Sequence, residues 1–203
     1  MTTGRGPRDP EALKAKWDER YRRSERVPPP APVLLENLHL LPRSGRALDL
    51  ACGLGVNALL LAQRGLEVTA WDLSAVAIER LQHQAKVRGR PIRAQVRDLQ
   101  ARPPRPKSFD VIVASYFLER DLAPALSAAL CPGGLLFYQT FCTEAVSDCG
   151  PSNPAFRLAT NELLGMFPDL IVRFYREEGR TGDITRGTRD LAMLVAQKPG
   201  TPG

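Results

Sequence analysis

The sequence predicts an α/β fold: a doubly wound, mostly parallel sheet of seven strands with an N-terminal helical segment. From Arg46 onward, short apolar runs alternate with segments of helical periodicity, the pattern of βαβ units with right-handed crossovers. The run 109–114, Phe-Asp-Val-Ile-Val-Ala, is almost entirely apolar, as expected of a central parallel strand covered on both faces. A chain of 203 residues is long enough to bury the core of one such domain.

The chain divides into an N-terminal helical lid and linker segment, residues 1–43, and an α/β domain, residues 44–198. We expect the aromatic face of Trp17 and Tyr21 to close as a lid over the ligand site of the domain; the alternative is that these two residues pack in the core. Asp9 and Pro10 predict the start of a helix that continues to Arg26, and the prolines at 28–32 predict an extended linker. Further helices are expected at 33–40, 55–64, 74–88, 118–130 and shortly after Thr160. Strands are expected at 46–51, 67–71, 92–97, 109–114, 135–141, 170–176 and 189–196.

Composition excludes several classes of protein. Hydrophobic residues make up 43% of the chain and charged residues 25%, ordinary values for a globular domain. No uncharged apolar run approaches the ~18 residues of a membrane span, and the polar N-terminus has no apolar signal core, so we expect a cytoplasmic protein. The four cysteines form no Cys-x-x-Cys pair and the chain has two histidines, so we expect free thiols and no metal site.

A glycine turn follows the first predicted strand of the domain. Gly53 and Gly55 stand between the strand and the next helix, an arrangement that lets backbone approach a nucleotide-like cofactor. Asp49 lies beside this turn, where its carboxylate would repel the pyrophosphate of a dinucleotide. S-adenosylmethionine (SAM) instead presents a cationic amino group and a sulfonium, so the acid favours SAM as the cofactor.

A second acid supports a nucleoside-type cofactor. Asp72 closes the next predicted strand, 19 residues after Gly53, where a carboxylate can accept both ribose hydroxyls. The alternative is that Asp72 only caps the helix that begins near Ser74.

Basic residues concentrate between positions 80 and 107. This segment holds nine arginines and lysines but one acid, Asp98, within a chain whose formal net charge is +6. It contains no aromatic residue that would stack on bases, which favours a solvated basic face, or steering of an anionic substrate, over nucleic-acid binding.

Five motifs in this order resemble those of the class I SAM-dependent methyltransferases, over residues 44–197. The resemblance implies a Rossmann-like fold and SAM as the cofactor. It implies that Asp98 contacts the adenine amine and that Leu99 and Leu73 pack on the two faces of the ring. The other matches are the Asp49–Gly55 turn, Asp72, Phe109-Asp110 and Pro132–Gly134. The implied cofactor-binding residues are Asp49, Ala51, Gly53, Gly55, Asn57, Asp72, Leu73, Asp98, Leu99 and Ser115.

Within that superfamily, the chain resembles the TehB-type tellurite-resistance and thiopurine-like branch. The resemblance rests on Trp17–Tyr21, Asn57, Trp71 before Asp72, and the pair Asn153–Phe156 and Asn161–Leu164. It implies methyl transfer to a small-molecule nucleophile, including sulfur, selenium and tellurium. Two alternatives stay open: an RNA or protein methyltransferase that uses the basic segment 80–107, and a SAM-binding module without activity.

The acceptor side of the site offers aromatic and basic candidates but no evident general base. Asn153-Pro-Ala-Phe156 differs from the Asn-Pro-Pro-Tyr type of amino-methyltransferase motif and follows the fifth strand instead of the fourth, so we do not assign it to amine methylation. A soft nucleophile needs little help from a base. The candidate substrate residues are Trp17, Tyr21, Tyr116 and Arg120. The alternative for Arg120 is a surface ion pair with Glu119 or Asp121.

Overall fold

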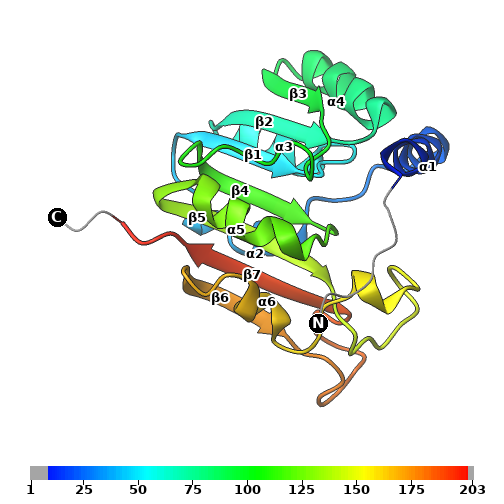
Figure 1. The fold of residues 1–203 in the computed structure, drawn as a ribbon, viewed down its shortest axis with the longest axis vertical. Coiled ribbons are helices and arrows are strands. Elements are labelled where there is room, and N and C mark those ends of the chain that lie inside the picture. Colours follow the sequence, from blue (N-terminus) through cyan, green and yellow to red (C-terminus); the bar gives the residue numbers. More distant parts are fainter. Residues whose placement is uncertain (1–8, 201–203) are drawn as a thin grey trace.

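The computed structural model describes residues 9–200. Residues 1–8 and 201–203 lie outside this part, and so does the expectation drawn from the polar segment Met1–Arg8. The strands form one sheet in the order β3-β2-β1-β4-β5-β7-β6 (Figure 1). Strands β1 to β5 are parallel, and β7 runs antiparallel to both β5 and β6. The predicted fold class, a mostly parallel seven-stranded sheet, is confirmed.

The strands lie close to where the apolar runs predict them. They are β1 (Arg46–Leu50), β2 (Glu67–Asp72), β3 (Ile92–Val96), β4 (Phe109–Ser115), β5 (Leu130–Phe141), β6 (Ile171–Glu177) and β7 (Leu191–Gln197). The largest difference is the start of β5. Leu130 already pairs with Phe109, and the register shifts before Val111 pairs with Leu135, so the Pro-Gly-Gly segment forms an irregular beginning of the strand.

The helices are α1 (Pro10–Arg23), α2 (Pro32–Glu36), α3 (Val56–Gln63), α4 (Ala75–Val87), α5 (Ala123–Ala129) and α6 (Glu162–Met166), with 3₁₀ turns η1 (Leu38–Leu40), η2 (Arg120–Leu122) and η3 (Pro154–Phe156). The helix predicted at 118–130 begins only at Ala123, because Pro124 fits the first turn of a helix and not its interior. Helix α1 ends at Arg23, three residues earlier than predicted, because Ser24 adopts an extended conformation.

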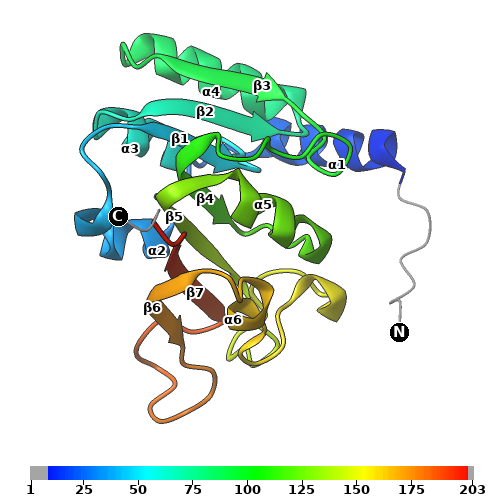
Figure 2. The same cartoon turned by 60° about the vertical axis from the view of Figure 1, so that its left-hand side comes forward.

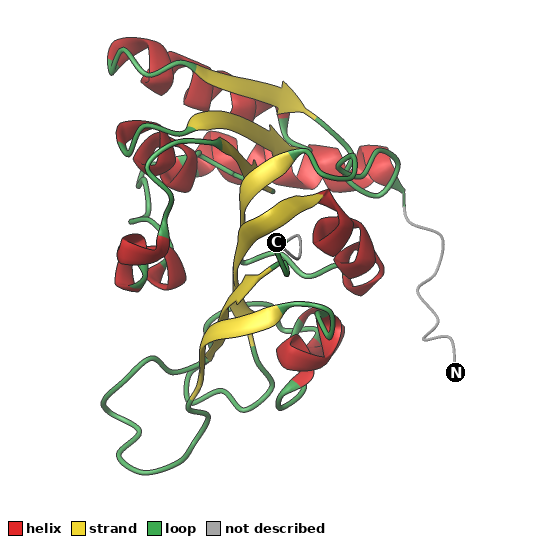
Figure 3. Ribbon diagram, turned by 90° about the vertical axis from the view of Figure 1, so that its left-hand side faces the viewer, coloured by secondary structure: helices red, strands yellow, loops and turns green. Residues whose placement is uncertain are grey.

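Helices cover the two faces of the sheet and bury one apolar cluster on each (Figure 3). On one face, α5 and α6 pack on strand residues such as Ile112 and Leu136. On the other, α2, α3 and α4 pack on residues such as Val111 and Phe137. Burying a leucine or phenylalanine in this way contributes about 1.5–3 kcal/mol. Strands β1 and β4 lie side by side at the point where the strand order reverses, and their carboxyl ends open the crevice in which α/β sheets bind ligands.

Helix α1 lies beside the start of α4 (Figures 1 and 2). The Asp18 carboxylate accepts hydrogen bonds from Ser74 Oγ (2.5 Å) and Val76 N (3.3 Å). Arg80 Nη1 donates to the carbonyls of Tyr21 (2.6 Å) and Ser24 (2.8 Å). No residue of α1 is fully buried, so polar contacts with α4 hold this helix. In residues 9–200 no helix is both long and apolar enough to cross a membrane.

Candidate functional site

The glycine turn after β1 has the conformation that the sequence predicts. Gly53 and Gly55 have φ angles of 52° and 73°, which glycine adopts without the steric cost paid by other residues. Cys52 N donates to Trp71 O (2.9 Å), and Gly55 N donates to Cys52 O (2.8 Å), so the turn is fixed to the end of β2. Ala51 opens it with a positive φ of 52°, a strained conformation of the kind that gathers at ligand sites.

Asp49 is completely buried beneath this turn. Its Oδ2 accepts a hydrogen bond from Ala58 N in the first turn of α3 (2.9 Å), while its Oδ1 has no hydrogen-bond partner within the described residues. Burial raises the pKa of Asp49 to about 8, although the Ala58 amide and the Asn57 side chain oppose the shift. A cation placed beside Oδ1 would restore the ionised carboxylate. The orphaned acceptor therefore fits the amino group of SAM.

Asp72 links the end of β2 to the glycine turn. Its Oδ2 accepts from Gly53 N and its Oδ1 from Ser74 N, each at 2.8 Å. Burial raises its pKa, and those hydrogen bonds oppose the rise. The helix cap is Ser74, whose Oγ accepts from Ala77 N (3.1 Å), so the alternative role of Asp72 as the cap of α4 is wrong. The carboxylate instead joins the end of β2 to the glycine turn, and its contact with a ribose stays a prediction.

The residues expected around the adenine follow β2 and β3. Arg97 N donates to Asp72 O (2.7 Å), which brings the end of β3 to the end of β2. The Asp98 carboxylate accepts from Gln100 N (3.0 Å) and Ala101 N (3.4 Å), and therefore shapes the loop. Leu99 is buried and Leu73 half-buried. Their contact with adenine stays a prediction.

A buried amide pair connects the site to the proline-rich linker, and the sequence identified only half of it. Asn57 Nδ2 donates to Ser115 Oγ (3.0 Å), and its Oδ1 accepts from Ala31 N (2.8 Å). Gln139 Oε1 accepts from Val33 N (2.8 Å), while Gln139 Nε2, fully buried, has no partner within the described residues. A lone glutamine in the apolar run of β5 is the signal that could have revealed Gln139.

One aromatic residue of α1, Tyr21, lies over the turn, and Trp17 stacks on it. Trp17 and Tyr21 stack with ring centroids 5.8 Å apart, and both are half-buried. A Cβ on Gly53 would lie 2.7 Å from the Tyr21 hydroxyl. Burial, followed by the nearby carboxylate of Asp72, raises the pKa of Tyr21. Neither ring belongs to the two apolar clusters of the sheet.

The two remaining candidate substrate residues, Tyr116 and Arg120, have different environments. Tyr116 follows β4 with a φ of 55°, is 49% exposed, and its ring lies 5.4 Å from that of Phe141. Arg120 instead forms an ion pair with Glu162 and donates to the carbonyls of Ala155 (2.7 Å) and Arg157 (2.9 Å). Its partner is thus neither Glu119 nor Asp121. Through these bonds Arg120 of η2 joins the loop after β5 to α6.

The described residues contain no group of three or more histidines, cysteines and carboxylates that could hold a metal ion. Both histidines are exposed, His39 on η1 and His83 on α4. The carboxylates nearest the turn, Asp49 and Asp72, are buried and accept backbone N–H bonds.

Comparison with known proteins places these residues in a family. Residues 47–134 match a methyltransferase-domain family. A ubiquinone biosynthesis O-methyltransferase of Paracidovorax citrulli is 32% identical over 168 residues, 77% of this chain and 60% of that protein. The chain spans about 60% of the length of the first curated relatives it matches.

Two solved structures share the fold. A structure from work on the conversion of a disulfide bond into a thioacetal group during echinomycin biosynthesis has a TM-score of 0.70, with 24% identity over 94% of both chains. TehB from Haemophilus influenzae has a TM-score of 0.66, with 22% identity over 91% of this chain and 66% of TehB.

Proposed function

Because this chain belongs to the class I SAM-dependent methyltransferases, we propose that it transfers the methyl group of SAM to a small-molecule nucleophile that ionises without a general base. SAM supplies an electrophilic methyl on a sulfonium. The chain would hold the cofactor through the glycine turn, with Asp49 beside the amino group and Asp72 at the ribose. Alignment and exclusion of water are then the main tasks of the protein.

The observation that carries this proposal is the set of side chains at the carboxyl ends of β4 and β5. Tyr116 and Phe141 form an aromatic wall there, and Gln139 of β5 supplies a buried amide donor. Burial raises the pKa of Tyr116, so its phenol stays protonated at neutral pH. Arg120 is engaged by Glu162. None of these groups is suited to accept a proton from an alcohol or an amine.

Such a site fits methyl acceptors that ionise near neutral pH and need no general base. Thiols and the oxyanions of selenium and tellurium are of this kind, as the resemblance to the TehB-type branch suggests. An acidic hydroxyl such as a phenol of low pKa fits as well, and the names of the O-methyltransferase relatives favour an oxygen acceptor. Sulfur, selenium, tellurium and acidic oxygen therefore form the proposed acceptor class.

A turnover screen with mass detection of the methylated product tests the proposal. The panel contains thiols, selenite, tellurite, thiopurines, phenols of graded pKa and total RNA. We expect turnover on the first five groups, and a rate that rises with pH through the pKa of the acceptor. If SAM binds but no member is methylated, the chain is a SAM-binding module; methylation of RNA alone would replace the small-molecule proposal.

A further inference from the structure

One face of β2 and β3 is left without a helix. The helices that pack on these strands, α3 and α4, lie on a single face, and the connection from β3 to β4 (residues 97–108) contains no helix (Figure 3). In the parallel register Thr69 pairs with Arg93 and Trp71 with Gln95, so these four residues share the opposite face. Arg93 and Gln95 are exposed there.

Two adjoining cavities lie against these strands, and the second also reaches residues of the helix-covered side such as Val68 and Ile92. One has a volume of about 520 Å³ and the other of about 760 Å³, and both are lined by Ser108 and Phe109. Together they extend past both ends of β3. We call their basic lining the arginine face: Arg46, Arg90, Arg93, Arg97, Arg102 and Arg105. Among the described residues, Glu67 is the only acid that lines either cavity.

The arginine face carries charge that the protein does not neutralise. Arg46 has a distant ion pair with Asp110 (3.9 Å), but the other five form none with a carboxylate of residues 9–200. Arg97 Nε and Nη2 donate to the carbonyls of Arg102 (2.7 Å) and Pro103 (2.9 Å), which gathers the positive charges around one cavity. Burial, followed by Arg102 and Arg105, lowers the pKa of Arg97. An anion in this cavity would relieve the repulsion.

The floor of the cavity offers no exposed apolar anchor. Trp71 and Phe109 line it but are buried, and the Arg97 guanidinium lies 3.8 Å from the centre of the Trp71 ring. Trp71 Nε1 is buried and has no acceptor within the described residues. Protein partners bind through exposed aromatic or aliphatic anchors, which this surface lacks. Arginine forks, in contrast, match phosphate oxygens.

We propose that the arginine face binds the phosphodiester backbone of a nucleic acid. The five residues of β3 extend about 16 Å, a length over which one strand of a duplex presents about five phosphates. Because no aromatic ring is exposed for base stacking, the binding is independent of sequence and strongly salt-dependent. This inference does not depend on the identity of the methyl acceptor.

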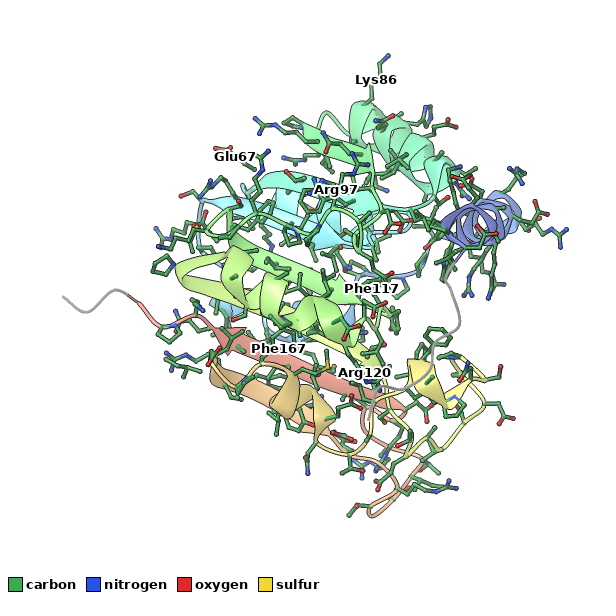
Figure 4. The ribbon with its side chains drawn as sticks, in the orientation of Figure 1. Glu67, Lys86, Arg97, Phe117, Arg120 and Phe167 are labelled. Atoms are coloured by element: carbon green, nitrogen blue, oxygen red, sulfur yellow. The ribbon has the colours of Figure 1, made fainter. Side chains whose placement is uncertain are left out.

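The test is fluorescence anisotropy of the full chain with a labelled RNA duplex of about 20 base pairs, measured across a salt series. The variant Arg102→Glu/Arg105→Glu changes two exposed arginines of the face. The matched control, Lys86→Glu/Arg88→Glu, makes the same charge change in the same basic segment, but at the end of α4, where Lys86 points away from the sheet (Figure 4).

We expect the first variant to bind an RNA duplex more than about tenfold more weakly, with a salt slope smaller by about 1.8 for two lost phosphate contacts, and the control to lose less than about twofold. Equal losses in both variants would overturn the proposal, as would wild-type protein that fails to bind at physiological salt. A poly-glutamate peptide of equal charge that binds as tightly as RNA would also overturn it.

Two further arms complete the experiment. A DNA of the same sequence shows whether the phosphodiester backbone alone is recognised. Weaker binding of DNA would identify RNA as the preferred ligand, and equal binding would support recognition of any phosphodiester backbone. Both variants should keep the SAM affinity of the wild type, since the arginine face contributes none of the predicted cofactor residues. Should the glutamate variant fold poorly, Arg102→Gln/Arg105→Gln provides the same comparison with half the charge change.

Discussion

The hydroxyl of Tyr21 lies over the backbone of Gly53, 2.7 Å from the point that a Cβ of residue 53 would occupy. The two residues belong to different parts of the chain: one to the N-terminal helix, the other to the turn after β1. Their contact joins the candidate lid to the predicted cofactor cradle, so the closure of α1 can be tested by mutation at either end.

A side chain at position 53 should disturb both the turn and the lid. Gly53→Ala has to tolerate a φ of 52° and a clash with Tyr21, and Gly53→Val is expected to abolish SAM binding. We expect Tyr21→Phe to recover part of the affinity lost in Gly53→Ala, because it removes the clashing hydroxyl. Calorimetry on the two single variants and the double variant measures this coupling. Strictly additive losses would show that the two residues act independently, and a folded Gly53→Val protein with normal affinity would place the cofactor elsewhere.

Asp72→Ala should weaken SAM binding by about 1.5–3 kcal/mol, because a charge-assisted acceptor is lost. The substitution also frees the N–H groups of Gly53 and Ser74, so thermal stability must be measured on the same samples. Glu79→Ala, at an exposed position of α4, serves as the control. Unchanged affinity in a folded Asp72→Ala protein would remove Asp72 from the site.

Asp49 should make the ligand-free protein less stable as pH rises. Burial raises its pKa to about 8 in the folded protein from the ordinary aspartate value of 3.8, so the folded state keeps a proton that the unfolded chain loses. The free energy of unfolding therefore falls between about pH 4 and pH 8. Binding of a cation beside Oδ1 should release up to about one proton near neutral pH. Calorimetry in two buffers of different ionisation enthalpy measures that release; Asp49→Asn should abolish it, and its persistence would assign the proton to another group.

Above about pH 8, where the buried Asp49 is ionised, NAD and NADP should fail to bind, because its carboxylate lies beside the turn where their pyrophosphate would have to sit. Thermal shift assays with each dinucleotide and with SAM at equal concentration provide the comparison. A dinucleotide that raises the melting temperature as much as SAM does would contradict the prediction.

Deleting residues 1–26 should leave a folded domain with weakened SAM binding and almost no turnover. The reason is that Tyr21 lies over the turn, Trp17 stacks on it, and both are outside the two apolar clusters, so their loss affects water exclusion and alignment more than the core. Melting temperature and turnover are measured on one sample. A melting temperature lower by several degrees with turnover intact would assign α1 to stability and defeat the lid.

Local patterns identified the strands, the turn and the two acids, because each depends on residues close together in sequence. The spacing between Gly53 and Asp72 reflects one βαβ unit, and it predicts their hydrogen bond without knowledge of packing. The segmentation of 118–130 was the main error in the helices, where Pro124 decides the start of α5.

Contacts between distant segments could not be predicted in the same way. Arg120 pairs with Glu162 across 42 residues, and Gln139 accepts a hydrogen bond from Val33 of α2, 106 positions earlier. Both depend on how the loops fold back on the sheet. The arginine face likewise arises from a missing helix between β3 and β4, and no single residue signals which side of a strand stays uncovered.

The linker before α2 limits how the lid can open. Four of the six residues from 28 to 33 are prolines and have no backbone N–H. The other two, Ala31 and Val33, donate their N–H groups to Asn57 and Gln139. The chain is thus anchored at residue 31, and only residues 24–30 are left as a tether, at most about 25 Å long. With α1 as the lid, we expect product release to break the part-buried polar contacts of Asp18 and Arg80 without disturbing the two apolar clusters. The rate at which product leaves should therefore be set by a few polar bonds and change with salt concentration.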